Sequence, residues 1–225
     1  MNEINNKTAQ RGRPNRISRE IIARAALDMG IQDATLMGVA KKLKVDRSSL
    51  YHHVKSRDDV IRLAAEIAVK DLQWQAPGDV SWREELIILT DSLWQLYAQH
   101  PGLAQVVQQA KVTPIEGIHA FAESVIRLQQ KGFSLNDAVM SVDLLVDMVC
   151  DSFLGWWSTD IVEVNGLLRK ERLIMLWQQQ ADLHPNRAEP INAMVAIMHA
   201  GSMQWWVNKR DLILDGIALR LDAAK

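Results

Sequence analysis

Apolar residues recur every three to four positions along almost the whole chain, the spacing of one face of an α-helix. Strand-like alternation of apolar and polar residues is scarce. The six prolines stand between the periodic segments, where helices would begin or end. The pattern therefore predicts an all-α fold, with helices over about 18–30, 35–43, 47–54, 57–73, 81–96, 101–111, 114–131, 134–158, 167–183 and 190–221. The expected N-caps are Ser18, Thr35, Asp46, Ser56, Ser81 and Ser134.

Charge is distributed unevenly along the chain. Residues 1–62 carry a formal charge of +6, whereas residues 63–225 carry −7. A basic head on an acidic body suggests a polyanion-binding module joined to a different one, although chance clustering of solvated charges would look the same. We expect a flexible basic arm (1–16), a basic domain (17–62) and an acidic domain (63–225).

Two short helices joined by a tight turn are expected over residues 35–54. This is the spacing of a helix-turn-helix, whose second helix reads the major groove of DNA. An ordinary helical hairpin would show a similar pattern. The outward face of the second helix would carry side chains rich in hydrogen-bond donors: Arg47, Ser48, Ser49, Tyr51, His52 and His53.

Residues 35–61, TLMGVAKKLKVDRSSLYHHVKSRDDVI, resemble the DNA-binding signature of the TetR family of transcription regulators. The resemblance covers about residues 17–65 and leans toward the tetracycline-repressor branch. It implies an N-terminal three-helix helix-turn-helix domain and a C-terminal helical domain that binds a ligand and dimerises. It also implies a repressor that a small-molecule effector releases from a palindromic double-stranded DNA operator. The matching positions are Thr35, Val39, Ala40, Val45, Ser49, Leu50, Tyr51, His53, Lys55 and Ser56.

The resemblance also assigns a role to each position that would meet DNA. The backbone of the DNA would be held by Thr35, Tyr51, His53 and Lys55, and base edges would be faced by Arg47, Ser48, Ser49 and His52. An arginine fork suits O6 and N7 of guanine, and a lysine suits a phosphate. The arginines of the basic arm could enter a minor groove or belong to a solubilising tail.

Two positions depart from the family pattern. Lys44 replaces a small residue, often glycine, in the turn between the two helices, where a positive φ would cost lysine about 1 kcal/mol. Met37 stands where some members carry an arginine that contacts bases. Base contacts from the first of the two helices are therefore not expected.

The acidic domain is expected to bind an apolar or aromatic effector. The chain has eight Trp and nine Met, residues that line adaptable pockets but also fill cores. Pocket candidates are Trp94, His100, Met140, Asp147, Met148 and Trp177. The resemblance further implies a homodimer formed by the helices near 134–158 and 190–221. Interface candidates, where they are not core, are Val142, Leu145, Val149, Phe153, Met194, Met198 and Trp205.

Other functional classes find less support in the sequence. Asp143, Asp147 and Asp151 lie four apart and could bind a cationic effector or a metal, but a solvated helix face explains them better, and we assign no metal or cofactor. Neither a G-x-S-x-G motif nor a Gly-rich phosphate loop occurs, so no enzyme is expected. The alternative is an all-helical enzyme or small-molecule-binding protein that uses the acidic and aromatic C-terminal bundle.

The cellular location is predicted from what the sequence lacks. A single cysteine, Cys150, permits no disulfide within the chain. No apolar run of membrane-spanning length and no secretory signal occurs. We therefore expect a cytoplasmic protein without a membrane partner.

Overall fold

The computed structural model describes residues 17–72, 78–109, 113–157, 159, 162 and 166–223, so the basic arm expected over 1–16 lies outside the described residues. Among the described residues, the only β pairing is an isolated bridge between Val162 and Leu168. The all-α prediction is confirmed. The helices are α1 (Arg19–Met29), α2 (Leu36–Leu43), α3 (Arg47–Leu50), α4 (Arg57–Asp71), α5 (Trp82–Gln99), α6 (Leu103–Gln108), α7 (Ile115–Gln130), α8 (Leu135–Trp157), α9 (Arg169–Leu183), η1 (Pro185–Arg187, 3₁₀), α10 (Ala188–Ala200) and α11 (Ser202–Ala223).

Five helices begin at the hydroxyl residues that the sequence predicts. In each, the side-chain oxygen before the helix accepts a hydrogen bond from a first-turn backbone N–H that has no partner within the helix. These N-caps are Ser18 of α1, Thr35 of α2, Ser56 of α4, Ser81 of α5 and Ser134 of α8. The expected cap of α3, Asp46, makes no such side-chain hydrogen bond. At α5 the Glu84 carboxylate also accepts from the Ser81 backbone N–H, at 3.0 Å, which completes a capping box.

Two helices differ from the sequence expectation. The segment expected as one helix over 190–221 is broken at Gly201, whose φ of 95° and ψ of 169° are open essentially to glycine alone. The helix expected over 47–54 ends at Leu50. The next residues form a turn, because the His53 N–H bonds to the Leu50 carbonyl only three residues back, at 2.8 Å.

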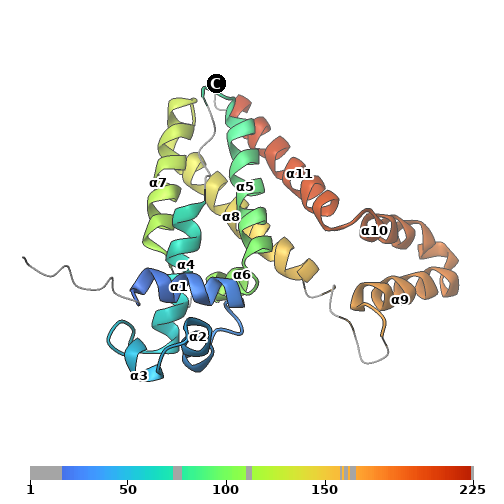
Figure 1. Cartoon of the computed structure of the whole chain (residues 1–225). Coiled ribbons are helices and arrows are strands. Elements are labelled where there is room, and N and C mark those ends of the chain that lie inside the picture. The colour runs from blue at the N-terminus through green and yellow to red at the C-terminus, as the bar shows by residue number, and fades with distance from the viewer. Residues whose placement is uncertain are drawn as a thin grey trace, which may run out of the picture.

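The helices form a head and a body that share α4 (Figure 1). The head consists of α1, α2 and α3 packed around the first half of α4. The body consists of the second half of α4 with α5, α6, α7, α8 and α11, and α8 contacts α5, α6, α7 and α11. The domain boundary expected between residues 62 and 63 therefore falls inside one continuous helix.

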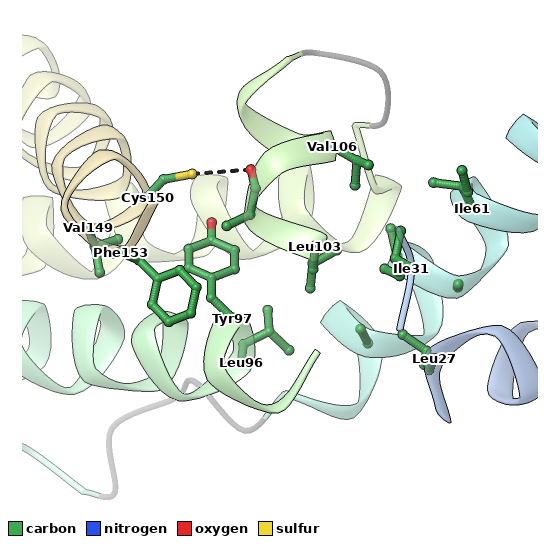
Figure 2. Packing of buried hydrophobic residues seen from close by; sticks show 14 of the residues in the cluster. Leu27, Ile31, Ile61, Leu96, Tyr97, Leu103, Val106, Val149, Cys150 and Phe153 are labelled. Carbon is green, nitrogen blue, oxygen red and sulfur yellow. Dashed lines mark hydrogen bonds between the residues drawn. The ribbon is translucent and has the colours of Figure 1, made fainter. Parts of the chain in front are cut away.

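One hydrophobic core runs through both head and body. Helix α6 joins them because Leu103 and Val106 are buried between α8 and the head. Figure 2 shows this continuity through Leu27, Ile31 and Ile61 of the head, Leu103 and Val106 of α6, and Tyr97, Cys150 and Phe153 of the body. The head therefore rests on the body through packed side chains.

Helices α9 and α10, with η1 between them, project from the body as an arm, which is distinct from the basic arm expected over residues 1–16 (Figure 1). The arm has a small core of its own, formed by Ile174, Val195 and Met198. Its main contact outside itself is between α10 and α11. Within the residues that the structure covers, no helix is both long and apolar enough to cross a membrane.

Candidate functional site

The turn between α2 and α3 depends on Lys44. This residue adopts a left-handed conformation, with φ 55° and ψ 48°, and has the only positive φ among the described non-glycine residues. The conformation brings the Val45 N–H to the Ala40 carbonyl, at 3.0 Å, and so closes the end of α2. The positive φ anticipated at this position is confirmed. Lysine accepts it at the cost of some backbone strain.

Buried residues fix which face of α3 is exposed. Val39, Ala40, Leu50 and Val54 are all buried against the head core, so the opposite face of α2 and α3 faces solvent. Of the eight residues expected to meet DNA, Ser49 and His53 are half-buried and the other six are exposed: Thr35, Arg47, Ser48, Tyr51, His52 and Lys55. Seven of the eight therefore lie on α3 or between α3 and α4, while Thr35 stands at the start of α2. Figure 1 shows α3 at the end of the head away from the body.

Arg47 and Tyr51 face each other on this surface. The Arg47 guanidinium donates a hydrogen bond to the Tyr51 hydroxyl at 2.7 Å, and its Cζ lies 5.5 Å from the centroid of the Tyr51 ring. Thr35 is already engaged as well, because its hydroxyl oxygen accepts from the Gly38 N–H at 3.0 Å. That oxygen can still donate its own proton to a ligand.

Charged groups hold the edge of the surface where α4 begins. The Lys55 backbone N–H donates to the Asp59 carboxylate at 3.1 Å. Partial burial alone would raise the pKa of Asp59, but hydrogen bonds from Arg62 and Lys55 and the charge of Arg19 hold the pKa below its ordinary value. Asp59 therefore stays ionised and positions the backbone on which Lys55 projects into solvent.

Arg57 has a structural role that the sequence analysis missed. Its guanidinium donates to the carbonyls of Ala34 and Gln32, each at 2.8 Å, in the turn between α1 and α2. It thereby ties the start of α4 to the turn that leads into α2. The sequence carries no local signal for this, because the partners are more than twenty residues away along the chain.

A cavity of about 150 Å³ lies inside the body, between α4, α5, α6, α7 and α8. Its walls are almost entirely apolar, and this composition suits an apolar ligand. The lining residues are Val69, Leu72, Leu89, Leu93, Leu96, Tyr97, Leu103, Val107, Pro114, Gly117, Ala120, Phe121, Ser124, Val142 and Val146.

None of the six pocket candidates lines this cavity, and the structure does not bring them together. Trp94 is buried between Phe153 and Trp206, with ring centroids 5.2 and 6.3 Å away. His100 ends α5 beside a shallow pocket shared with Asp71, and burial lowers its pKa. The others lie apart: Met140 in a groove beside α11, Asp147 exposed on α8, Met148 half-buried on the core, and Trp177 in the arm.

The aspartates of α8 lie on its exposed side. Asp143, Asp147 and Asp151 are all solvent-exposed, and none of them lines the interior cavity. No group of three or more His, Cys, Asp or Glu side chains that could hold a metal ion occurs among the described residues. The acidic stripe thus matches the solvated face favoured by the sequence.

An exposed apolar face runs along α8 and α11. Met140 and Leu144 of α8 and Leu212 and Leu219 of α11 are exposed, and an open groove of about 550 Å³ lies between the two helices. The interface candidates Val142, Leu145, Val149 and Phe153 are instead buried in the chain's own core, and Met198 in the core of the arm. The candidates on α8 lie on the opposite side of that helix from its exposed face. The spacing of apolar residues alone could not show which side of the helix the chain's own core covers.

These features, a helix-turn-helix head on an all-helical body with an apolar cavity, match known regulators in fold. The TetR family protein ActR of Streptomyces coelicolor, in complex with (S)-DNPA, aligns with a TM-score of 0.73 and 20% identity over 90% of this chain and 98% of its own. A TetR variant of Acinetobacter baumannii in complex with minocycline aligns with a TM-score of 0.61 and 17% identity over 91% and 98%. The chain therefore has the TetR-type fold, as the sequence resemblance implied.

Sequence comparison gives more limited matches. An HTH-type transcriptional regulator of Saccharopolyspora erythraea is 27% identical over 112 residues, which are 48% of this chain and 46% of that protein. The matched segment thus spans less than half of the relative. No family model matches the sequence.

Proposed function

We propose that this chain is a DNA-binding transcription regulator of the TetR type whose head reads double-stranded DNA with α3. The observation that carries the proposal is the exposed set on and beside α3, which the buried seam of Leu50 and Val54 holds outward. Arg47, Ser48 and His52 would contact base edges, together with the half-buried Ser49. Thr35, Tyr51, His53 and Lys55 would position the DNA backbone.

The regulator would act as a homodimer joined along the exposed apolar face of α8 and α11. Leu212 and Leu219 are 75% and 74% exposed, which is unfavourable for large aliphatic side chains unless another surface covers them. A two-fold symmetric dimer would present two α3 helices, and their operator half-sites would lie about 34 Å apart, one turn of DNA.

A small apolar effector would bind in the interior cavity and release the operator. Leu103 and Val107 of α6 line that cavity, and the residues just before α6 touch the head: the Ile31 N–H donates to the Pro101 carbonyl at 3.0 Å. A ligand that displaces α6 would therefore also displace the turn between α1 and α2. Emptying an operator about a hundredfold needs a differential affinity of about 2.7 kcal/mol between the two states.

The test of DNA reading begins with sites selected from a random pool of duplex DNA. We expect a near-palindromic sequence and an affinity that falls steeply with salt. Arg47→Ala should cost about 1–3 kcal/mol of DNA-binding free energy and relax the base preference at one position of the site. Lys55→Ala should weaken binding to all DNA sequences equally and reduce the slope of log affinity against log salt concentration by about 1.

Lys70→Ala is the matched control, because Lys70 is also an exposed lysine but lies in the last turn of α4, at the opposite end from Lys55 and α3. Its DNA affinity should equal that of the unchanged protein. If the double variant Arg47→Ala, Lys55→Ala bound DNA as tightly as the control, the proposed reading surface would be wrong.

A further inference from the structure

A second cavity lies where the arm joins the body. It measures about 170 Å³, is partly open to solvent, and is lined by the end of α8, by α9 and α10 of the arm, and by the start of α11. In Figure 1 the arm lies beside the end of α8 and the start of α11, on the opposite side of the body from α4 and α7. It shares no lining residue with the interior cavity proposed for the effector.

Aromatic and sulfur-containing side chains form its walls. Trp156 and Trp205 meet edge to face, with ring centroids 5.4 Å apart and an interplanar angle of 76°. Met194 and Met198 of α10 line it as well, together with the aliphatic side chains of Leu173 and Ile197. Flat indole rings and polarisable thioethers pack well against a planar aromatic ring, and a cavity of about 150 Å³ is known to hold benzene.

Two polar groups in the lining, the Lys170 ammonium and the Trp156 indole N–H, favour an anion as ligand. The Lys170 ammonium lies 4.8 Å from the centroid of the Trp156 ring and forms no ion pair with any described residue, so a positive charge stands at the cavity wall. Trp156 is buried, and its indole N–H has no hydrogen-bond partner among the described residues. A buried donor without a partner is costly, which points to an acceptor that completes it.

We propose that this cavity binds a small aromatic carboxylate of the size of benzoate. The ring would lie against Trp205, Met194 and Met198, and the carboxylate would accept from the Trp156 indole N–H and from Lys170. The ligand would contact all four helices and fix the arm to the body. This site is separate from the proposed effector cavity and does not depend on DNA binding.

Titration of the full-length protein with sodium benzoate, followed through the indole N–H signals of ¹⁵N-labelled protein, tests the proposal. Trp156→Phe identifies the Trp156 signal by its loss. We expect that signal to shift saturably toward higher frequency as its N–H gains an acceptor. Calorimetry should give an affinity about tenfold weaker for Lys170→Met, which keeps the aliphatic chain and removes the charge.

Lys209→Met is the matched control. The Lys209 ammonium also lies over an indole, 3.8 Å from the centroid of Trp205, but Lys209 does not line the cavity. Its benzoate affinity should be unchanged. Toluene should bind the unchanged protein about tenfold more weakly than benzoate, a comparison that needs no variant to fold. A Trp156 signal that benzoate leaves in place, or equal affinity of Lys170→Met and Lys209→Met, would overturn the proposal.

Discussion

At the scale of single residues, Lys44 adopts a left-handed backbone conformation that glycine adopts more easily. The αL conformation at this position ends α2 and aims α3, so the chain must adopt it whatever residue stands there. Glycine adopts it without a Cβ penalty, whereas lysine pays one. The turn geometry is therefore kept by the packing of the buried residues on both sides.

Lys44→Gly should stabilise the chain by up to about 1 kcal/mol, since relief of the αL strain exceeds the extra freedom that glycine gives the unfolded chain. Urea unfolding followed by circular dichroism measures the change. Lys41→Gly, inside α2, is the control and should destabilise the chain by about 0.5–1 kcal/mol. Equal destabilisation by both variants would show that Lys44 is not strained.

At the scale of elements, local signals and tertiary contacts account for what was and was not predictable. The N-caps at Ser18, Thr35, Ser56 and Ser81 were predicted correctly because each acts within one helical turn. The break at Gly201 was missed, because glycine inside a periodic segment is often tolerated within a helix.

The interior cavity was not predictable in the same way. Its lining comes from five helices, and the sequence marks Val, Leu and Ala at these positions only as core. The Trp and Met residues expected in the pocket lie elsewhere, and Trp94, for example, stacks on Trp206 in the core. The periodicity of apolar residues shows which face of a helix is buried. It does not show where side chains of neighbouring helices leave a cavity between them.

The contact between α6 and the head gives a prediction at this scale. Gly102 precedes α6 with φ 88°, and a Cβ there would lie 2.9 Å from the Gln32 backbone nitrogen. Gly102→Ala should therefore separate α6 from the turn between α1 and α2 and break the bond from the Ile31 N–H to Pro101. We expect faster hydrogen exchange of the Ile31 amide, measured by NMR.

Gly132→Ala is the control for that experiment. Gly132 also has a positive φ, 96°, but a Cβ there meets nothing within 4 Å. The variant carries the same kind of backbone strain without the clash, so Ile31 exchange should stay as in the unchanged protein. Similar acceleration in both variants would mean that strain, and not the lost contact, controls the turn.

At the scale of the whole molecule, the proposed homodimer is joined along the exposed face of α8 and α11, which gives a test of the assembly state. Leu212→Asp places a charge in the centre of that face and should convert a dimer into monomers, as measured by light scattering after size-exclusion chromatography. Operator affinity should fall with it, because two heads no longer bind together.

Leu183→Asp serves as the comparison, since Leu183 is 61% exposed at the end of α9, away from that face. This variant should remain dimeric. A dimer that survives Leu212→Asp, or one that is lost equally in both variants, would place the subunit contact elsewhere.

The shared core of head and body has a genetic consequence. Because Leu103 and Val106 pack against both, damage to the core of the body should also weaken the packing of the head. Substitutions at buried positions of α5 or α8, far from any nucleotide, would score in a reporter-gene screen as loss of operator control. A map of such alleles would trace the hydrophobic core, and α3 would account for only a small share of them.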